Sequence, residues 1–457
     1  MSTTNLPIEY NQSTPIGVVS TDPYNWLIFD KLFEDFRIVT EIKQGWILDL
    51  PLKAQVSWVG RSKQYGNSTT KLMRSKMFVE FFRRDRRRKF VMYSPMDPPY
   101  KINPLAYIMN SPTISHAYEN KRYFRDEFAD RIRMPEYEIR YMNELDRAAA
   151  YKELEQKYGD FMLQDEESSG SKGTYAIKNA DDYVDAIKSL KKFSRGRTIV
   201  VSKFIKGAPA SIQVCVTKHG VFNGGIQKQL IDSQYLGSSE LEGANKWCGG
   251  EVGVEYPDIV HHQTQEIASI VGSEMARHGY KGVFGVDLII TPENEVYAIE
   301  INARLTGYSH IISDLQIIDG KIPFMLLHTL ELGNLDYKVV DMAALPSAGR
   351  YKKPASLMIL NNPLDGDLRL KHYIRPGVYK QVGNKVEFVR PGYSLQDLRG
   401  DNQMLIFSRH AEGDLVERGR RVLKVMLYGK TMAKNGDLNA KGRSIIAAVK
   451  NTFELES

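Results

Sequence analysis

Two carboxylates and a carboxamide lie close together in a part of the chain that has the composition of a β-hairpin. Asp287 lies in the apolar run 284–290, and Glu300 and Asn302 lie in a second β-rich run, 296–304. Because strand side chains alternate, the polar residues share one face and valine, leucine and isoleucine share the other. A surface hairpin with scattered charges is the alternative, but the apolar face indicates that the sheet is buried.

The expected register brings the two carboxylates together. If Thr291 pairs with Val296, Asp287 faces Glu300 directly across the antiparallel ladder. Like charges in this position destabilise a sheet unless a cation compensates them, and carboxylate and amide oxygens are the ligands that Mg²⁺ prefers. We therefore predict that Asp287, Glu300 and Asn302 hold Mg²⁺, with Mn²⁺ as an alternative.

A second candidate is the loop of small residues 168–174, between the expected strands 161–164 and 175–178. Loops of this kind let backbone N–H groups approach an anion closely. No Gly-x-x-x-x-Gly-Lys-Ser/Thr motif is present, so the loop is not a Walker loop. Taken alone, a loop of serine and glycine is more often just a flexible hairpin.

The order of these motifs resembles the ATP-grasp superfamily over about residues 115–318. Lys121, which opens an expected helix, resembles the first nucleotide-binding lysine of that family, and the segment 161–178 resembles its phosphate-covering lid. The strand 200–207 resembles the hinge whose backbone reads the adenine edge. The resemblance implies an ATP site formed by Lys121, Gln164, Ser169, Gly170, Ser171, Gly173, Thr174, Ser202, Lys203, Phe204 and Ile205.

Three positions depart from the pattern of that family. Gln164 occupies the place of its second lysine, and Ser202 occupies the place of an acidic residue at the start of the hinge. After Arg304, the run 305–308 lacks the glutamate that acts as a base in biotin carboxylase. Bicarbonate-dependent carboxylation is therefore not expected, and the sequence is more similar to the amino-acid ligases of the superfamily.

The resemblance implies an ATP-dependent carboxylate–amine ligase that forms ADP. A small carboxylate, such as an amino acid or a peptide, would attack the γ-phosphate, and an amine acceptor would then displace phosphate to give an amide. Arg304 offers a forked donor beside the metal ligands and is expected to bind the carboxylate or the acylphosphate. Lys228 is expected to reach the transferring phosphate, although a solvated strand lysine is an equal alternative.

Other activities stay open at this point. One is a ligase that uses a thiol or another nucleophile, and another is a non-catalytic protein that only binds a nucleotide. The basic run 83–89 raises the question of nucleic acid, but it has no interleaved aromatic residues. A solvated helix end explains that run better, so no nucleic-acid partner is expected.

Three regions are needed to position these residues. We expect an α/β plus α+β chain, with a Rossmann-like pre-ATP-grasp domain at 1–115 and an ATP-grasp fold of two lobes at 116–345. The lid lobe would span about 145–205, and an α+β domain would follow at 346–457. In that last domain, short strands are expected to alternate with one basic helix over 415–427.

Composition narrows the class of protein. The chain has 457 residues, a net charge of +7 and 42% hydrophobic residues, which is ordinary for a globular protein. No apolar run approaches the ~18 residues of a membrane span, and the start of the chain lacks a signal-peptide core. Only two cysteines are present, which excludes a disulfide scaffold. We therefore expect a cytoplasmic protein without a membrane partner, and a homodimer stays open.

Overall fold

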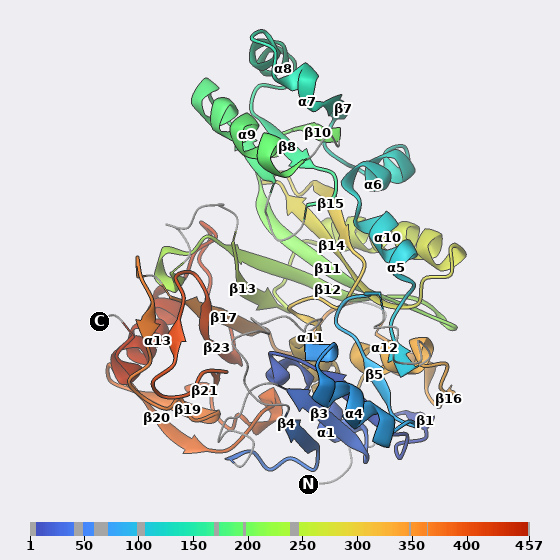
Figure 1. The fold of residues 1–457 in the computed structure, drawn as a ribbon, viewed down its shortest axis with the longest axis vertical. Coiled ribbons are helices and arrows are strands. Elements are labelled where there is room, and N and C mark those ends of the chain that lie inside the picture. The colour runs from blue at the N-terminus through green and yellow to red at the C-terminus, as the bar shows by residue number, and fades with distance from the viewer. Residues whose placement is uncertain are drawn as a thin grey trace.

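The computed structural model describes residues 6–40, 49–58, 72–97, 106–168, 173–194, 198–237, 246–346, 349–362 and 364–455. Figure 1 shows a long central sheet, with the N-terminal region in blue below it and a small lobe above it. The C-terminal region, in red, continues the sheet to one side. The expected mixed α/β architecture of several regions is confirmed.

The N-terminal region is built on a parallel sheet in the order β4-β3-β2-β5-β6. Its central strand, β2 (Ile16–Val19), is buried along its whole length. Ligands of open parallel sheets bind outside the carboxyl ends of the strands. That edge carries Ser20, Thr21 and Asp22 after β2, and Tyr93 beyond β5. The other elements are η1 (Pro23–Trp26), α1 (Phe29–Leu32), β3 (Phe36–Thr40), β4 (Gln55–Trp58), α4 (Lys76–Arg84), β5 (Lys89–Val91) and β6 (Tyr107–Ile108).

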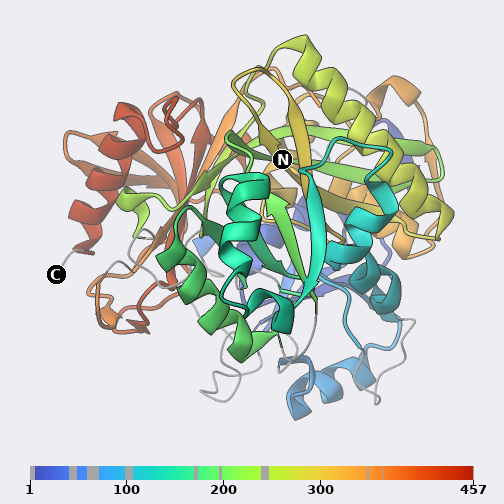
Figure 2. The same cartoon turned by 90° about the horizontal axis from the view of Figure 1, so that it is seen from above.

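Two helices then lead into the small lobe. Asn120 separates them, and its side chain caps the second helix by accepting a hydrogen bond from the Tyr123 N–H. The lobe is an antiparallel sheet in the order β7-β10-β8-β9, and Figure 2 shows it in front of the central sheet when seen from above. The elements are α5 (Pro112–Glu119), α6 (Lys121–Phe128), β7 (Tyr137–Tyr141), α7 (Met142–Leu145), α8 (Ala150–Tyr158), β8 (Phe161–Asp165), β9 (Thr174–Ile177), α9 (Ala180–Phe193) and β10 (Thr198–Lys203).

The central sheet has ten antiparallel strands in the order β15-β14-β11-β12-β13-β17-β23-β21-β19-β20. Helix α10 packs on β11 and β12, and α12 packs on β11 and β14. A separate pairing of β1 with β16 ties the start of the described chain to this region. The elements are β1 (Ile8–Tyr10), β11 (Ala208–Thr217), β12 (Gly220–Ile231), η3 (Gln234–Leu236), β13 (Trp247–Val252), α10 (Asp258–Arg277), β14 (Gly282–Ile290), β15 (Val296–Asn302), α11 (Ser309–Ile318), α12 (Phe324–Leu332), β16 (Tyr337–Val339) and η4 (Met342–Ala344).

The C-terminal strands extend this same sheet, because β17 pairs with β13. The antiparallel pairing runs from Gly249 with Met358 to Val252 with Ala355. The C-terminal region is thereby joined to the central one through a continuous ladder. Its elements are β17 (Ala355–Asn361), β18 (Leu368–Arg369), β19 (Gly377–Val382), β20 (Lys385–Arg390), η5 (Leu395–Asp397), β21 (Gln403–Phe407), β22 (Leu415–Val416), β23 (Arg421–Tyr428) and α13 (Ala440–Phe453).

The basic helix predicted over 415–427 is wrong, since this segment forms β22 and β23. Strand β23 lies between β17 and β21, and six consecutive residues from Val422 to Leu427 are buried. A strand covered on both faces has a nearly continuous apolar run, which periodicity cannot distinguish from a buried helix. The helix of this region is α13 instead, and the Asn439 side chain caps it by accepting from the Gly442 N–H.

Of the helices in the described ranges, none is both long and apolar enough for a membrane span.

Candidate active site

Asp287 on β14 and Glu300 on β15 are direct partners in the antiparallel ladder, as predicted. The route to this register differs from the expectation, because Ile290 rather than Thr291 pairs with Val296. An extra residue on β15, Ile299, forms a β-bulge that shifts the ladder by one and brings the carboxylates opposite each other. Bulges near active sites commonly re-aim side chains in this way.

Asp287 is held by two amides. Its Oδ1 accepts a hydrogen bond from Gln229 Nε2 at 2.9 Å, and its Oδ2 accepts from Asn302 Nδ2 at 2.9 Å. Burial, and then the facing charge of Glu300, raises the pKa of Asp287 to about 7. This carboxyl is therefore poised to lose its proton when a cation arrives.

Glu300 is paired with the predicted nucleotide lysine. Lys121 Nζ lies 3.2 Å from Glu300 Oε2 and donates to the Ser168 carbonyl at 2.6 Å. Burial acts to raise the pKa of Glu300, but Lys121 and then Arg304 outweigh it, so the net pKa is lowered. Because Ser168 begins the predicted phosphate loop, Lys121 connects that loop to the carboxylate pair.

Arg304 follows β15 and lies beside the same group. Its Nη1 donates to Glu119 Oε1 and to Asn302 Oδ1, each at 2.7 Å. Burial acts to lower the pKa of Arg304, but Glu119 and the other nearby anionic groups outweigh it. Arg304 therefore stays charged. Its guanidinium is connected to Asp287 through the side chain of Asn302, which bonds both residues.

The donor set suits a hard divalent cation. Within the described ranges, no group of three or more histidine, cysteine or acidic side chains is placed to hold a metal ion. A cation here would depend on the two facing carboxylates and on neutral oxygens, which is the ligand class of Mg²⁺. The raised pKa of Asp287 and the proximity of two carboxylates fit such an ion. The side chain of Asn302 lies beside the carboxylate pair. Its Oδ1, however, accepts a hydrogen bond from Arg304 and does not face the carboxylates.

Lys228 is not brought to this group. Its Nζ donates to the Ala433 carbonyl at 2.9 Å, and the residue does not border the cavity beside the carboxylates. Its neighbour Gln229 reaches Asp287 instead. Since adjacent strand residues point to opposite faces, Gln229 at the site places Lys228 on the far side of β12. The expected role of Lys228 on the phosphate is therefore wrong.

The start and end of the predicted phosphate loop are in place. Gly173 has a φ of +71°, and its carbonyl accepts from the Asp165 N–H at 2.8 Å. Thr174 is the ladder partner of Gln164. The loop positions Ser169, Gly170 and Ser171 lie outside the described residues.

Gln164 has a buried cationic partner that the sequence analysis missed. Arg125 Nη2 donates to Gln164 Oε1 at 3.1 Å, and its Nη1 donates to the carbonyl of the bulged Ile299 at 3.1 Å. Arg125 is 1% exposed, and burial lowers its pKa to about 10. Lys121 and Arg125 are four residues apart on α6, so they share a helix face, and this spacing was the available signal.

The hinge residues connect the small lobe to β11. Ser202 is buried, and the N–H groups of Lys203 and Phe204 donate to the carbonyls of Glu136 and Asp160, at 2.9 and 3.0 Å. These two N–H groups are therefore used within the protein. Ile205, the last predicted nucleotide residue, is half-buried beside them.

A cavity of about 680 Å³ opens next to the carboxylate pair. Asp287, Glu300, Asn302 and Arg304 form one part of its wall, and none of the predicted nucleotide residues that the structure describes lines it. Glu300 thus contacts Lys121 and also borders the cavity. The arrangement can hold a nucleotide phosphate and a second molecule on the two sides of one cation.

Other parts of the cavity wall come from both ends of the chain, and these were missed from the sequence. The N-terminal contribution includes Ser20, Thr21 and Asp22 at the carboxyl edge of β2. The charged residues of the C-terminal contribution are Arg409, Arg420, Arg421 and Lys424. The position of residues 20–22 after the first parallel strand was the only usable signal.

Comparison with known proteins supplies an independent view. Residues 118–308 match the family described as the ATP-grasp domain. Among curated proteins, no sequence matches this chain.

Solved structures match over nearly the whole chain. The biotin carboxylase domain of 2-oxoglutarate carboxylase from Hydrogenobacter thermophilus has a TM-score of 0.60 at 10% identity, covering 91% of this chain and 86% of that one. Phosphoribosylamine–glycine ligase from Thermotoga maritima has a TM-score of 0.55 at 14% identity, with coverages of 95% and 96%. L-amino acid ligase from Bacillus licheniformis has a TM-score of 0.55 at 11% identity, with coverages of 92% and 94%. At these identities the likeness establishes a shared multi-domain fold.

Proposed function

We propose that this chain, whose residues 118–308 match the ATP-grasp domain family, is an ATP-dependent, ADP-forming ligase that joins a carboxylate to an amine. The observation that carries the proposal is the Asp287–Glu300 pair, which lies between Lys121 and a cavity of about 680 Å³. Phosphoryl transfer requires charge neutralisation and alignment more than covalent help from the protein. A cation held by this pair would provide both, at the boundary between a nucleotide side and a substrate side.

Asp287 and Glu300 would hold Mg²⁺, with Asn302 as the neighbouring amide. The ion would supply charge neutralisation to the β- and γ-phosphates of ATP. Lys121 would bind the phosphates from the other side and carry the lid loop with it, because its Nζ already contacts the Ser168 carbonyl. Arg304 would receive the substrate carboxylate at the cavity wall through its fork of N–H donors.

The reaction would then proceed in two displacements. A carboxylate oxygen attacks the γ-phosphorus, the bond to the β–γ bridging oxygen breaks, and ADP leaves. The amine then attacks the acyl carbon, phosphate leaves with the bonding electron pair, and the amine loses a proton. Arg304 would stabilise the acylphosphate oxygens, and no nucleophilic side chain is needed.

The similar structures support this class of reaction. Two of them are named as ligases, phosphoribosylamine–glycine ligase and L-amino acid ligase. The biotin carboxylase domain was solved with MgADP and bicarbonate. For this chain we propose ATP and Mg²⁺, a small carboxylate such as an amino acid or peptide, and an amine acceptor.

A second candidate function is nucleotide binding without catalysis. Gln164 in place of a lysine and the occupied N–H groups of Lys203 and Phe204 favour it, since both weaken the expected ATP contacts. The two candidates differ in turnover. A panel of amino acids and small acids is incubated with MgATP, and the nucleotides are separated by chromatography. The ligase produces ADP and phosphate with some members of the panel, whereas AMP requires another mechanism and unchanged ATP supports simple binding.

A further inference from the structure

A group of charged side chains forms part of the cavity wall apart from the carboxylate pair. We call it the cationic wall, and it consists of Arg409, Arg421 and Lys424 together with Asp22. Lys424 Nζ lies 2.6 Å from Asp22 Oδ2 and donates to Asn25 Oδ1 at 2.5 Å. Arg421 Nη1 donates to that same Asp22 oxygen.

Local backbone features bring these residues to one face. On β23, the ladder to β17 shifts by one residue at Val422, which is an extra residue on that strand. Without this bulge, Arg421 and Lys424 would point to opposite faces of the sheet, because they are three residues apart. Asp22 arrives from the carboxyl edge of β2, which is where α/β sheets bind their ligands.

The wall has an excess of positive charge. Among the residues that the structure describes, six cationic side chains and three carboxylates line the cavity, and two of the carboxylates are Asp287 and Glu300. Asp22 is the third, and one of its oxygens serves both Arg421 and Lys424. Lys424 is only 3% exposed. Burial lowers the pKa of Lys424 to about 8; Asp22 opposes this shift, whereas Arg421 and then Arg409 add to it.

Buried cations are costly unless an anion compensates them. Among the described residues, the Nε of Arg421 is buried and has no hydrogen-bond partner. Ser20 and Thr21 line the same cavity. The carboxylate pair and the cationic wall border the same cavity, so one small molecule can contact both.

We propose that the cationic wall binds an oxyanion, either a carboxylate or a phosphate, that belongs to one of the two substrates. This group is distinct from the carboxylate to be activated, which would lie at Arg304 and the metal. The proposal that an anion binds here depends only on the residues of the cationic wall. The proposal that this anion is a substrate group rests on the proposed function.

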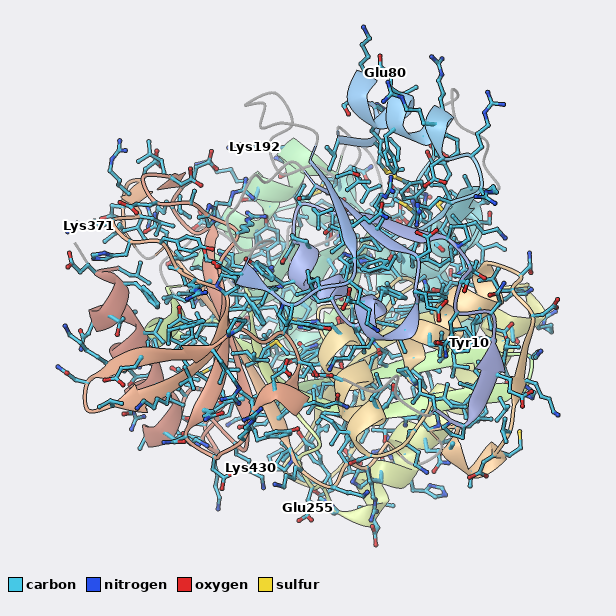
Figure 3. The ribbon with its side chains drawn as sticks, turned by 90° about the horizontal axis from the view of Figure 1, so that it is seen from below. Tyr10, Glu80, Lys192, Glu255, Lys371 and Lys430 are labelled. Atoms are coloured by element: carbon cyan, nitrogen blue, oxygen red, sulfur yellow. The ribbon has the colours of Figure 1, made fainter. Side chains whose placement is uncertain are left out.

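Calorimetric titration with inorganic phosphate and with acetate tests the wall. The protein is first saturated with MgADP, so that the nucleotide phosphate contacts are filled. Lys424→Met and Arg421→Gln are compared with Lys430→Met and Arg418→Gln. Lys430 is exposed at the molecular surface (Figure 3), and Arg418 pairs with Asp365 at 3.3 Å outside the cavity. We expect at least a tenfold loss of affinity in the first two variants and no change in the controls.

The two probes distinguish the source of the anion. Tighter binding of phosphate supports a phosphorylated substrate, and tighter binding of acetate supports a second carboxylate. Equal affinity in all five proteins, or no binding of either probe to the parent chain, overturns the proposal. If MgADP does not bind while the wall variants still lose anion affinity, the proposed function is wrong and the proposal of an anion site at the cationic wall is supported.

Chemical modification of the parent chain tests the same proposal without variants, and it is therefore informative even if a wall variant does not fold. Arginine residues are modified with phenylglyoxal and located by mass spectrometry, with and without phosphate. We expect phosphate to protect Arg421 and to leave Arg418 equally reactive. Equal modification of Arg421 in both conditions overturns the proposal.

Discussion

Glu300 forms an ion pair with Lys121 at 3.2 Å, across the boundary between the small lobe's phosphate loop and the central sheet. Lys121 also donates to the Ser168 carbonyl, so one ammonium group connects the loop with the carboxylate pair. A nucleotide phosphate that enters here has to share Lys121 with Glu300. We therefore expect nucleotide and cation to bind cooperatively, since the cation replaces Lys121 as the partner of Glu300.

Removing either carboxylate should abolish turnover while the fold survives. Asp287→Asn or Glu300→Gln takes away one of two anionic cation ligands, so ADP release should fall by orders of magnitude. Because the native carboxylates face each other, Asp287→Asn should leave the melting temperature unchanged or raise it when Mg²⁺ is absent. Rates of ADP release and thermal melts with and without Mg²⁺ check both points. Full activity in either variant contradicts the assignment.

Lys121 and Arg304 should have separable effects. Lys121→Ala is expected to weaken ATP binding, because Gln164 brings no second charge from β8. Arg304→Ala should leave ATP affinity nearly intact but lower kcat and kcat/KM together, at a cost on the order of 2–4 kcal/mol of transition-state stabilisation. Nucleotide affinity and single-turnover rates are measured on both. Glu119→Gln, which removes only the Arg304 partner, serves as the matched control and should have a smaller effect. Loss of ATP binding in Arg304→Ala would contradict this division.

Arg125 should make a lysine at position 164 unfavourable. Gln164→Lys would place a second cation next to a guanidinium that is 1% exposed and now bonds Gln164 at 3.1 Å. We expect the free energy of unfolding to fall by roughly 2–4 kcal/mol. In the Arg125→Met background, the same substitution should cost at least about 1 kcal/mol less, because the like charge is gone. Equal costs in the two backgrounds, from urea denaturation, would show that the two sites are not coupled.

Lys424 should give anion binding a pH dependence. Its pKa is lowered to about 8 by burial, against its ordinary 10.5, so the ammonium is lost as the pH rises through about 8. Affinity for acetate should therefore fall between pH 7 and 9. Of the groups that face it, Asp22 stays ionised because its pKa is lowered by Lys424 and Arg421 despite burial, and His310, with a pKa of about 3, stays neutral. Arg409 and Arg421 are the other charged groups near Lys424.

The matched variant for this titration is Lys424→Arg, which keeps the charge through pH 9 and should show no such decline. The folded state itself gains stability as the pH rises from about 8 towards 10.5, because the unfolded chain still holds the proton that Lys424 has lost. A flat acetate affinity in the parent chain, or the same decline in the arginine variant, contradicts the role of Lys424.

The hairpin could be predicted from the sequence because its contacts are local. Asp287 and Glu300 are joined by one tight turn, and alternation alone indicated that they share a face. The bulge at Ile299 was invisible, since a one-residue slip leaves no compositional trace. The expected register paired Thr291 with Val296, whereas the actual register contains the bulge at Ile299. Both registers place Asp287 opposite Glu300.

The cavity wall could not be predicted, because its contacts join residues that are far apart in the sequence. Asp22 and Arg421 are 399 residues apart, and they meet only once β23 joins the central sheet. The same segment was expected to be a helix, which would have spread its charges around an axis. The role predicted for Lys228 was wrong for a different reason. Strand alternation allows either Lys228 or Gln229 to face the site, and the sequence does not indicate which one does.

The central claim is that a substrate carboxylate becomes an acylphosphate at the Asp287–Glu300 pair. Hydroxylamine trapping tests it without knowledge of the natural amine, because hydroxylamine converts an acylphosphate to a hydroxamate. The chain is incubated with MgATP, hydroxylamine and a panel of carboxylates, and hydroxamate and nucleotides are quantified together. The account predicts hydroxamate and ADP in equal amounts for at least one carboxylate, and neither product with Glu300→Gln. Hydroxamate accompanied by AMP, or equal yields from Glu300→Gln, would contradict it.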